Sequence, residues 1–181
     1  RHTMGLTVEQ KLTIHELLGR SALAYDERDL PTLESGFAPH ASLSMRIAGG
    51  DLIGPFEGRE AIMKLFTDSM AEQSDVRRHV VSNIFFDESG EDPIAISNLT
   101  LVATENGEIN LLTAGIYRDT LVQLDGSWRI SHRHIELQVL LTVAKCYEYR
   151  KDSCENRPAG PGPRSTDRHP QPAPHDLWAA G

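Results

Sequence analysis

The chain has 181 residues and a formal net charge of −8, with 18 Lys and Arg against 26 Asp and Glu. This length fits one ordinary domain with a sizeable core. The acidic balance argues against nucleic acid as the main partner, because phosphate binding needs a basic face, and against binding to an anionic membrane surface. No apolar run approaches the roughly 20 residues that a membrane span needs.

The cellular compartment is predicted from the N-terminus and the two cysteines. Residues 1–6 contain no apolar h-region, so no secretion signal is expected. We treat these six residues as an N-terminal extension that resembles an artificial leader. Cys146 and Cys154 form no Cys-x-x-Cys pair, which disfavours a thiolate metal site. We therefore expect a cytoplasmic protein without structural disulfides.

The first helix is predicted from its cap and its apolar spacing. Thr7 opens it, with Gln10 as the capping-box partner. One stripe of residues then recurs at helical spacing: Ile14, Leu17, Leu18, Ser21, Ala22 and Tyr25. Tyr25 is the last member of the stripe, so its side chain is expected to point into the core at the helix end.

A short second helix, a strand and a third helix are predicted next. Asp29 is the N-cap of the second helix, Phe37 lies on its buried face and Pro39 ends it. Alternating apolar and polar residues predict a strand over 42–47. Residues 54–58 are expected to form a loop that leads into the third helix, whose inward side chains are Ile62, Leu65, Phe66 and Met70.

From residue 77 onward the pattern has period two and predicts four long strands. They span about 77–87, 93–105, 109–124 and 127–141. The turns between them are Ser89-Gly90, Asn106-Gly107 and Asp125-Gly126, and the last two are among the strongest short hairpin signals. Consecutive hairpins give an antiparallel sheet, so the predicted fold class is α+β. A long twisted sheet curling around a helix leaves a concave space for a small molecule.

The chain is therefore divided into an extension at 1–6, an α+β domain at 7–150 and a tail at 151–181. The tail is predicted to be flexible because six prolines fall among Gly, Ser, Arg and His: Pro158, Pro161, Pro163, Pro170, Pro172 and Pro174.

Four segments carry a family resemblance. They are AYDERDL at 24–30, GREAI at 58–62, RHVVSN at 78–83, and YRD at 117–119 followed by GSWRI at 126–130. With the order of elements, these segments resemble the SnoaL-like superfamily over about residues 7 to 140. The resemblance implies the cone fold of nuclear transport factor two, in which a curved antiparallel sheet forms a cone-shaped barrel around N-terminal helices.

Within this superfamily, the Tyr-Asp pair followed by a strand histidine is similar to scytalone dehydratase. The similarity implies that Asp26 and His79 form the proton-transfer unit and that Tyr25 activates the substrate or a bound water. Other pocket positions of that family differ here. A second tyrosine is replaced by Met45, and a second histidine has no counterpart near Ala103. Scytalone itself is therefore not the expected substrate.

The chemistry of these residue types supports the same assignment. Imidazole can take and return a proton near neutral pH, and an adjacent carboxylate fixes its tautomer. The alternative for His79 is a buried histidine satisfied by a backbone partner. Asp26 could instead face solvent beyond the helix end, and Tyr25 could be an ordinary core tyrosine. Six further residues are predicted to line the pocket: Met45, Phe56, Leu65, Asn98, Thr113 and His134.

The last strand leaves two alternatives open. Period two assigns Trp128, Ile130, His132 and His134 to one face and Arg129, Ser131, Arg133 and Ile135 to the other. The resemblance suggests that the second set lines the pocket, but a bulge would exchange the faces. His132 and His134 could also chelate a metal with His79. This is the minor alternative, and the site is expected to hold no metal.

No phosphate-binding glycine loop or nucleophile elbow is present, so no cofactor is expected. The predicted function is a cofactor-independent dehydratase, isomerase or cyclase acting by acid–base catalysis on a small polyketide-like or aromatic intermediate. A homodimer through the sheet is expected. One alternative is a non-catalytic binding module or dioxygenase small subunit that uses Trp128 and Tyr117 against a partner chain. The other is an epoxide-opening cyclase or hydrolase, which would need a second carboxylate beside Asp26.

Overall fold

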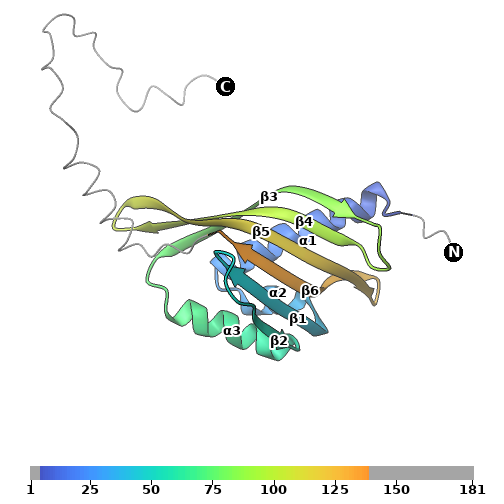
Figure 1. Cartoon of the computed structure of the whole chain (residues 1–181), viewed down its shortest axis with the longest axis horizontal. Helices are drawn as coiled ribbons and strands as arrows, with labels where there is room; N and C mark the ends of the chain where they lie inside the picture. The colour runs from blue at the N-terminus through green and yellow to red at the C-terminus, as the bar shows by residue number, and fades with distance from the viewer. Residues whose placement is uncertain (1–4, 139–181) are drawn as a thin grey trace, which may run out of the picture.

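The computed structural model describes residues 5–138 (Figure 1). It contains the helices α1 (Val8–Asp26), α2 (Leu30–Ser35) and α3 (Arg59–Ala71), and the strands β1 (Phe37–Ile47), β2 (Ile53–Glu57), β3 (Val76–Asp87), β4 (Ile94–Glu105), β5 (Glu108–Leu124) and β6 (Ser127–Leu137). The predicted end of the last strand at residue 141, both cysteines and the proline-rich tail lie outside the described residues.

The six strands form one curved sheet in the order β2-β1-β6-β5-β4-β3. β1 and β6 run parallel, and the other neighbouring pairs are antiparallel. α1 packs against β3 and α3 against β1, so the helices cover the concave face (Figure 1). The predicted α+β fold is confirmed. Within residues 5–138 the sheet is mixed, because β1 and β6 are parallel, and open, because β2 and β3 lie at its two edges.

The first helix begins as its sequence predicts. Thr7 accepts a hydrogen bond from the amide of Gln10, and the Gln10 side chain accepts one from the amide of Thr7, which completes the capping box. Ile14, Leu18 and Ser21 are buried along the predicted stripe. The stripe therefore directs α1 onto the sheet and brings its C-terminal end to β3.

Two local predictions in the first half are wrong. The second helix ends at Ser35, and Phe37 begins β1 instead of lying on that helix. Pro39 falls inside β1, where the register with β6 shifts, and proline is tolerated at such irregularities. Residues 53–57 form the strand β2 rather than a loop. Because β2 is an edge strand, its proline costs no ladder hydrogen bond on the open side.

The hairpin turns are confirmed, and bulges change three of the long strands. Asn106 and Asp125, each followed by glycine, adopt the positive φ values that tight hairpin turns require. In β3 the register shifts between Ser82 and Phe85, around Asn83 at φ 52°. In β5 the pairing with β4 skips Leu112. In β6 the pairing with β5 skips Ser131. Each bulge moves the following side chains to the other face of the sheet.

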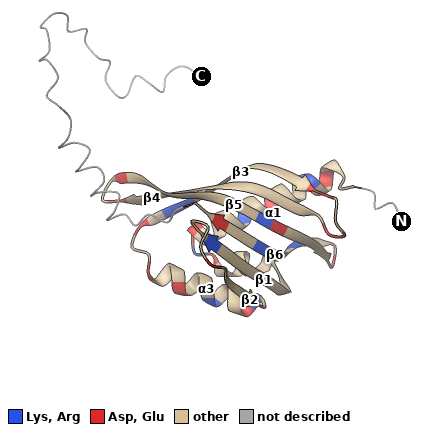
Figure 2. Ribbon diagram, viewed as in Figure 1, with Lys and Arg blue, Asp and Glu red and all other residues tan. Residues whose placement is uncertain are grey.

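The charges on the two longer helices are mixed. α1 and α3 each carry both acidic and basic residues, so neither helix presents a continuous basic stripe (Figure 2). Within residues 5–138, none of the helices is both long and apolar enough to cross a membrane.

Candidate functional site

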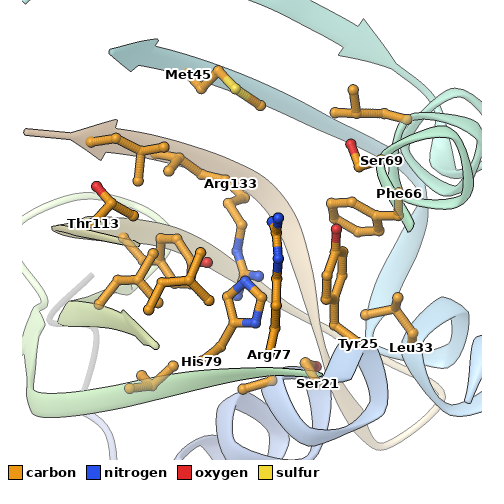
Figure 3. A pocket seen from close by; sticks show the side chains of 18 of the residues that line it. Ser21, Tyr25, Leu33, Met45, Phe66, Ser69, Arg77, His79, Thr113 and Arg133 are labelled. Atoms are coloured by element: carbon orange, nitrogen blue, oxygen red, sulfur yellow. The ribbon is translucent and has the colours of Figure 1, made fainter. Parts of the chain in front are cut away.

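A cavity of about 210 Å³ lies between the concave face of the sheet and the helices. Most of its wall is apolar, and the polar exceptions come from several elements (Figure 3). The polar residues in the wall are Ser21, Tyr25, Ser69, Arg77, His79, Thr113, Tyr117 and Arg133. The volume is below the ~300–1,000 Å³ typical of sites for drug-sized ligands, so the cavity suits a compact molecule.

His79 is held in this wall by Asp26, the last residue of α1. Its ring Nδ1 lies 2.6 Å from Asp26 Oδ1, and its backbone amide donates to Asp26 Oδ2 at 2.8 Å. The Asp26 side chain is 3% exposed and the His79 side chain 13%. A carboxylate only accepts hydrogen bonds, so this contact requires a proton on Nδ1, and in a neutral imidazole the lone pair is then on Nε2. The arrangement presents an oriented base to the cavity.

Tyr25 lies beside this pair. Its ring packs edge-on against His79 at 4.8 Å and against Phe66 at 5.4 Å between ring centroids. Its hydroxyl accepts a hydrogen bond from Gln73 at 3.1 Å, which leaves the hydroxyl proton available to a ligand. Burial raises the pKa of Tyr25, although hydrogen bonds with Gln73 and Ser69 and the charge of Arg77 act in the opposite direction. The hydroxyl therefore stays protonated and can act as a donor.

A buried ion pair forms another part of the wall, and it was not predicted. Arg133 Nε and Nη2 donate to Asp119 Oδ1 and Oδ2 at 2.6 and 2.8 Å. The Arg133 guanidinium lies 4.5 Å from the centre of the Tyr117 ring. Burial would lower the pKa of Arg133, but the Asp119 carboxylate more than offsets this and raises it. Asp119 is fully buried, so the pair is fixed in one geometry.

Three of the six predicted pocket residues line the cavity, and three do not. Met45, Leu65 and Thr113 line the cavity. Phe56 is outside the wall, packed against the core from the edge strand β2. Asn98 and His134 are on the outer face of the sheet, so these three pocket predictions are wrong. His134 points outward because side chains alternate along β6 and its two neighbours, Arg133 and Ile135, point into the cavity.

The bulge at Ser131 resolves the alternatives for the last strand. Ile130 from the first predicted set is fully buried, while Arg133 and Ile135 from the second set line the cavity. The bulge at Ser131 breaks the alternation, so Ile130 before it and Arg133 and Ile135 after it all lie on the inner face. Tyr117, predicted as a partner-binding residue in the non-catalytic alternative, is 7% exposed and belongs to the cavity wall.

The three-histidine alternative does not match the geometry. His132 and His134 share hydrogen bonds with Ser42 and Ser44 on the outer face, whereas His79 lies in the cavity. Residues 5–138 contain no cluster of three or more His, Cys, Asp or Glu side chains with a spacing suited to a metal.

Comparison with solved structures identifies the fold class. A protein of unknown function with a cystatin-like fold from Nostoc punctiforme is 24% identical, with a TM-score of 0.65, over 77% of this chain and 99% of that chain. Aln2 from a Streptomyces species is 22% identical, with a TM-score of 0.62, over 74% and 94%. A candidate scytalone dehydratase from Novosphingobium aromaticivorans is 21% identical, with a TM-score of 0.58, over 72% and 85%. At these identities the similarity concerns the fold.

The family follows from the sequence match. The family model of the SnoaL-like domain matches residues 6–134, which is most of the chain. The protein belongs to the SnoaL-like domain family. No protein with a curated description matches it significantly.

Proposed function

We propose that the protein is a cofactor-independent enzyme that dehydrates, isomerises or cyclises a small polyketide-like or aromatic intermediate by acid–base catalysis. The observation that carries the proposal is the 2.6 Å contact between Asp26 and His79 in the wall of an apolar cavity. His79 Nε2 takes the proton, and Asp26 stabilises the imidazolium that forms. The Tyr25 hydroxyl donates to the substrate oxygen on which charge develops.

The geometry gives less support to the two alternatives. A purely structural subunit would fill its core, whereas this chain keeps a cavity with polar groups in its wall. Epoxide opening would use two carboxylates around one water. Among the described residues that line the cavity there is no carboxylate, and Asp26 is positioned behind His79.

The proposal can be tested without knowing the natural substrate. The probe is 2-tetralone in D₂O, whose activated C1 protons exchange when a base removes them, followed by proton NMR. The protein should accelerate exchange above the buffer rate, and His79→Ala should lower this acceleration by about 10²–10⁴-fold, the usual contribution of one acid–base group. His40→Ala is the matched control, because His40 is exposed on β1 outside the cavity wall. Equal exchange by the wild-type and His79→Ala proteins would contradict the role of His79.

A further inference from the structure

Three basic side chains in the cavity wall are each paired with an aspartate that is not part of the wall. Arg77 pairs with Asp75 at 2.8 Å, and His79 and Arg133 pair with Asp26 and Asp119 at 2.6 Å. The residues that line the cavity include all three basic partners and none of the three aspartates. The two arginine pairs therefore turn their positive ends toward the cavity, and the Asp26–His79 pair turns its imidazole there, although the chain as a whole is acidic.

The two arginines keep donors for a ligand. Each uses Nε and Nη2 on its aspartate, at 2.8 and 3.3 Å for Arg77 and at 2.6 and 2.8 Å for Arg133. Within the described part of the chain, Nη1 of neither side chain has a protein acceptor. A guanidinium bound along one edge in this way is held in place and still presents N–H groups on another edge.

The two tyrosines of the wall can also donate hydrogen bonds. The Tyr25 hydroxyl accepts from Gln73 and can donate to a ligand. The Tyr117 hydroxyl stays protonated, since burial raises the pKa of Tyr117 to about 12. Figure 3 shows Tyr25, Arg77, His79 and Arg133 directed toward the same region from α1, β3 and β6. A ligand cation would meet no carboxylate in this wall, whereas an oxyanion would meet several donors.

We infer that the cavity selects a compact ligand that carries an oxyanion, such as a carboxylate, phenolate or enolate, and that Arg77 and Arg133 bind this group. Arg133 would orient the bound oxyanion, because the Asp119 carboxylate and the Tyr117 ring hold its guanidinium in one position. Arg77 is more accessible, with its side chain 24% exposed. The inference rests on the proposed function in taking this cavity as the substrate site, and it adds the chemical class of the substrate.

The test compares three probes of similar shape by isothermal titration calorimetry at neutral pH: 2-naphthoate, 2-naphthamide and 2-naphthylmethylammonium. The carboxylate should bind about tenfold more tightly than the neutral amide, since charge-assisted hydrogen bonds are roughly twice as strong as neutral ones. The ammonium should bind most weakly. An amide that binds as tightly as the carboxylate, or no measurable binding of millimolar 2-naphthoate, would overturn the inference.

A matched pair of variants locates the effect. Arg77→Gln should reduce the preference for 2-naphthoate several-fold, whereas Arg78→Gln should leave it unchanged. Arg78 is the next residue on β3, lies on the outer face, and pairs with Glu27 instead of lining the cavity. Equal losses in the two variants would show a general effect of net charge and would overturn the assignment of Arg77.

Arg133 is tested in a neutral pair, Arg133→Gln with Asp119→Asn, so that no buried charge is left alone. This variant should also lose the preference for the carboxylate, and a retained preference would remove Arg133 from the proposal. If the double variant does not fold, the inference is still tested by the preference of the wild-type protein for 2-naphthoate and by the comparison of Arg77→Gln with Arg78→Gln. All readouts are binding at equilibrium. A protein that prefers 2-naphthoate but does not catalyse exchange would thus contradict the proposed function alone.

Discussion

The Asp26 carboxylate bonds both the backbone amide and the imidazole ring of His79, which is 53 residues further along the chain. One oxygen fixes the position of the strand relative to α1, and the other fixes the tautomer of the ring. The same carboxylate therefore has a structural role and a proposed role in proton transfer. Experiments must separate the two.

Substituting Asp26 by asparagine makes this separation. In Asp26→Asn the amide oxygen can still accept from the His79 backbone, but the amide cannot stabilise an imidazolium ion. We expect exchange of the 2-tetralone probe to fall by at least about 10²-fold while the circular dichroism spectrum is unchanged. The double variant with His79→Ala should be barely slower than the slower single variant, because the two residues act as one unit. Independent, additive losses would argue against a dyad.

Tyr25→Phe tests the proposed donor. The phenylalanine ring keeps the contacts with His79 and Phe66 and removes only the hydroxyl. If this hydroxyl acts mainly on the transition state, kcat for exchange should fall while KM changes little. His40→Ala is again the control, because His40 is exposed on β1 outside the cavity wall. An increase in KM alone would identify Tyr25 as a binding residue.

The parts of the site that the sequence predicts depend on short-range signals or on the resemblance. Asn106-Gly107 and Asp125-Gly126 encode their hairpins locally, and the stripe of α1 places Tyr25 inward. The family resemblance, not the periodicity, is what joins Asp26 to His79, because nothing in the local sequence relates residues so far apart.

Part of the misplacement of strand residues comes from bulges. A single bulge residue reverses every later side chain of a strand, and neither Asn83 nor Ser131 has a strong sequence signal. Strict alternation would place His79 and Phe85 on one face, but the bulge between them leaves Phe85 58% exposed on the other face. The Arg133–Asp119 pair depends on the register between β5 and β6. That register is set by the whole hairpin, including its bulge.

The Arg133–Asp119 pair should be strongly coupled in stability. Arg133→Met leaves the fully buried Asp119 without its partner, and the loss should be about 3–5 kcal/mol in urea denaturation. Adding Asp119→Leu should recover much of this loss, because the remaining buried charge is removed. The exposed pair between Arg20 and Glu16 is the comparison, and breaking it with Arg20→Gln should cost less than about 1 kcal/mol. Similar losses at both sites would contradict the buried geometry.

Stability should fall in alkaline solution because of Tyr117. Burial raises its folded-state pKa to about 12, from the ordinary value of 10.0. The unfolded chain therefore loses this proton first, so the stabilisation is complete below pH 10 and is lost as the pH rises toward 12. Between pH 9 and pH 11, the free energy of unfolding in urea should fall by about 1 kcal/mol more in the wild type than in Tyr117→Phe. Equal pH dependence of the two proteins would show that Tyr117 ionises freely.

The outer face of the sheet is predicted to form a homodimer. The exposed fractions of Val80 and Phe85 on β3 and of Leu111 on β5 are 48%, 58% and 54%. These apolar side chains lie on the face opposite the helices, where they would favour association. Light scattering at micromolar concentration should give a dimeric mass, and Phe85→Lys should shift it toward the monomer, because the charge would be buried without a partner.

Leu12→Lys is the matched control for the dimer, because Leu12 is 65% exposed on α1, away from the sheet. This variant should keep the dimeric mass, since it adds the same charge outside the predicted interface. A monomeric wild-type protein would contradict the prediction. Dissociation by Leu12→Lys to the same extent as by Phe85→Lys would place the interface elsewhere or show that net charge alone controls association. A dimer that persists in Phe85→Lys but dissociates in Leu12→Lys would assign the contact to α1, with the sheet face left exposed.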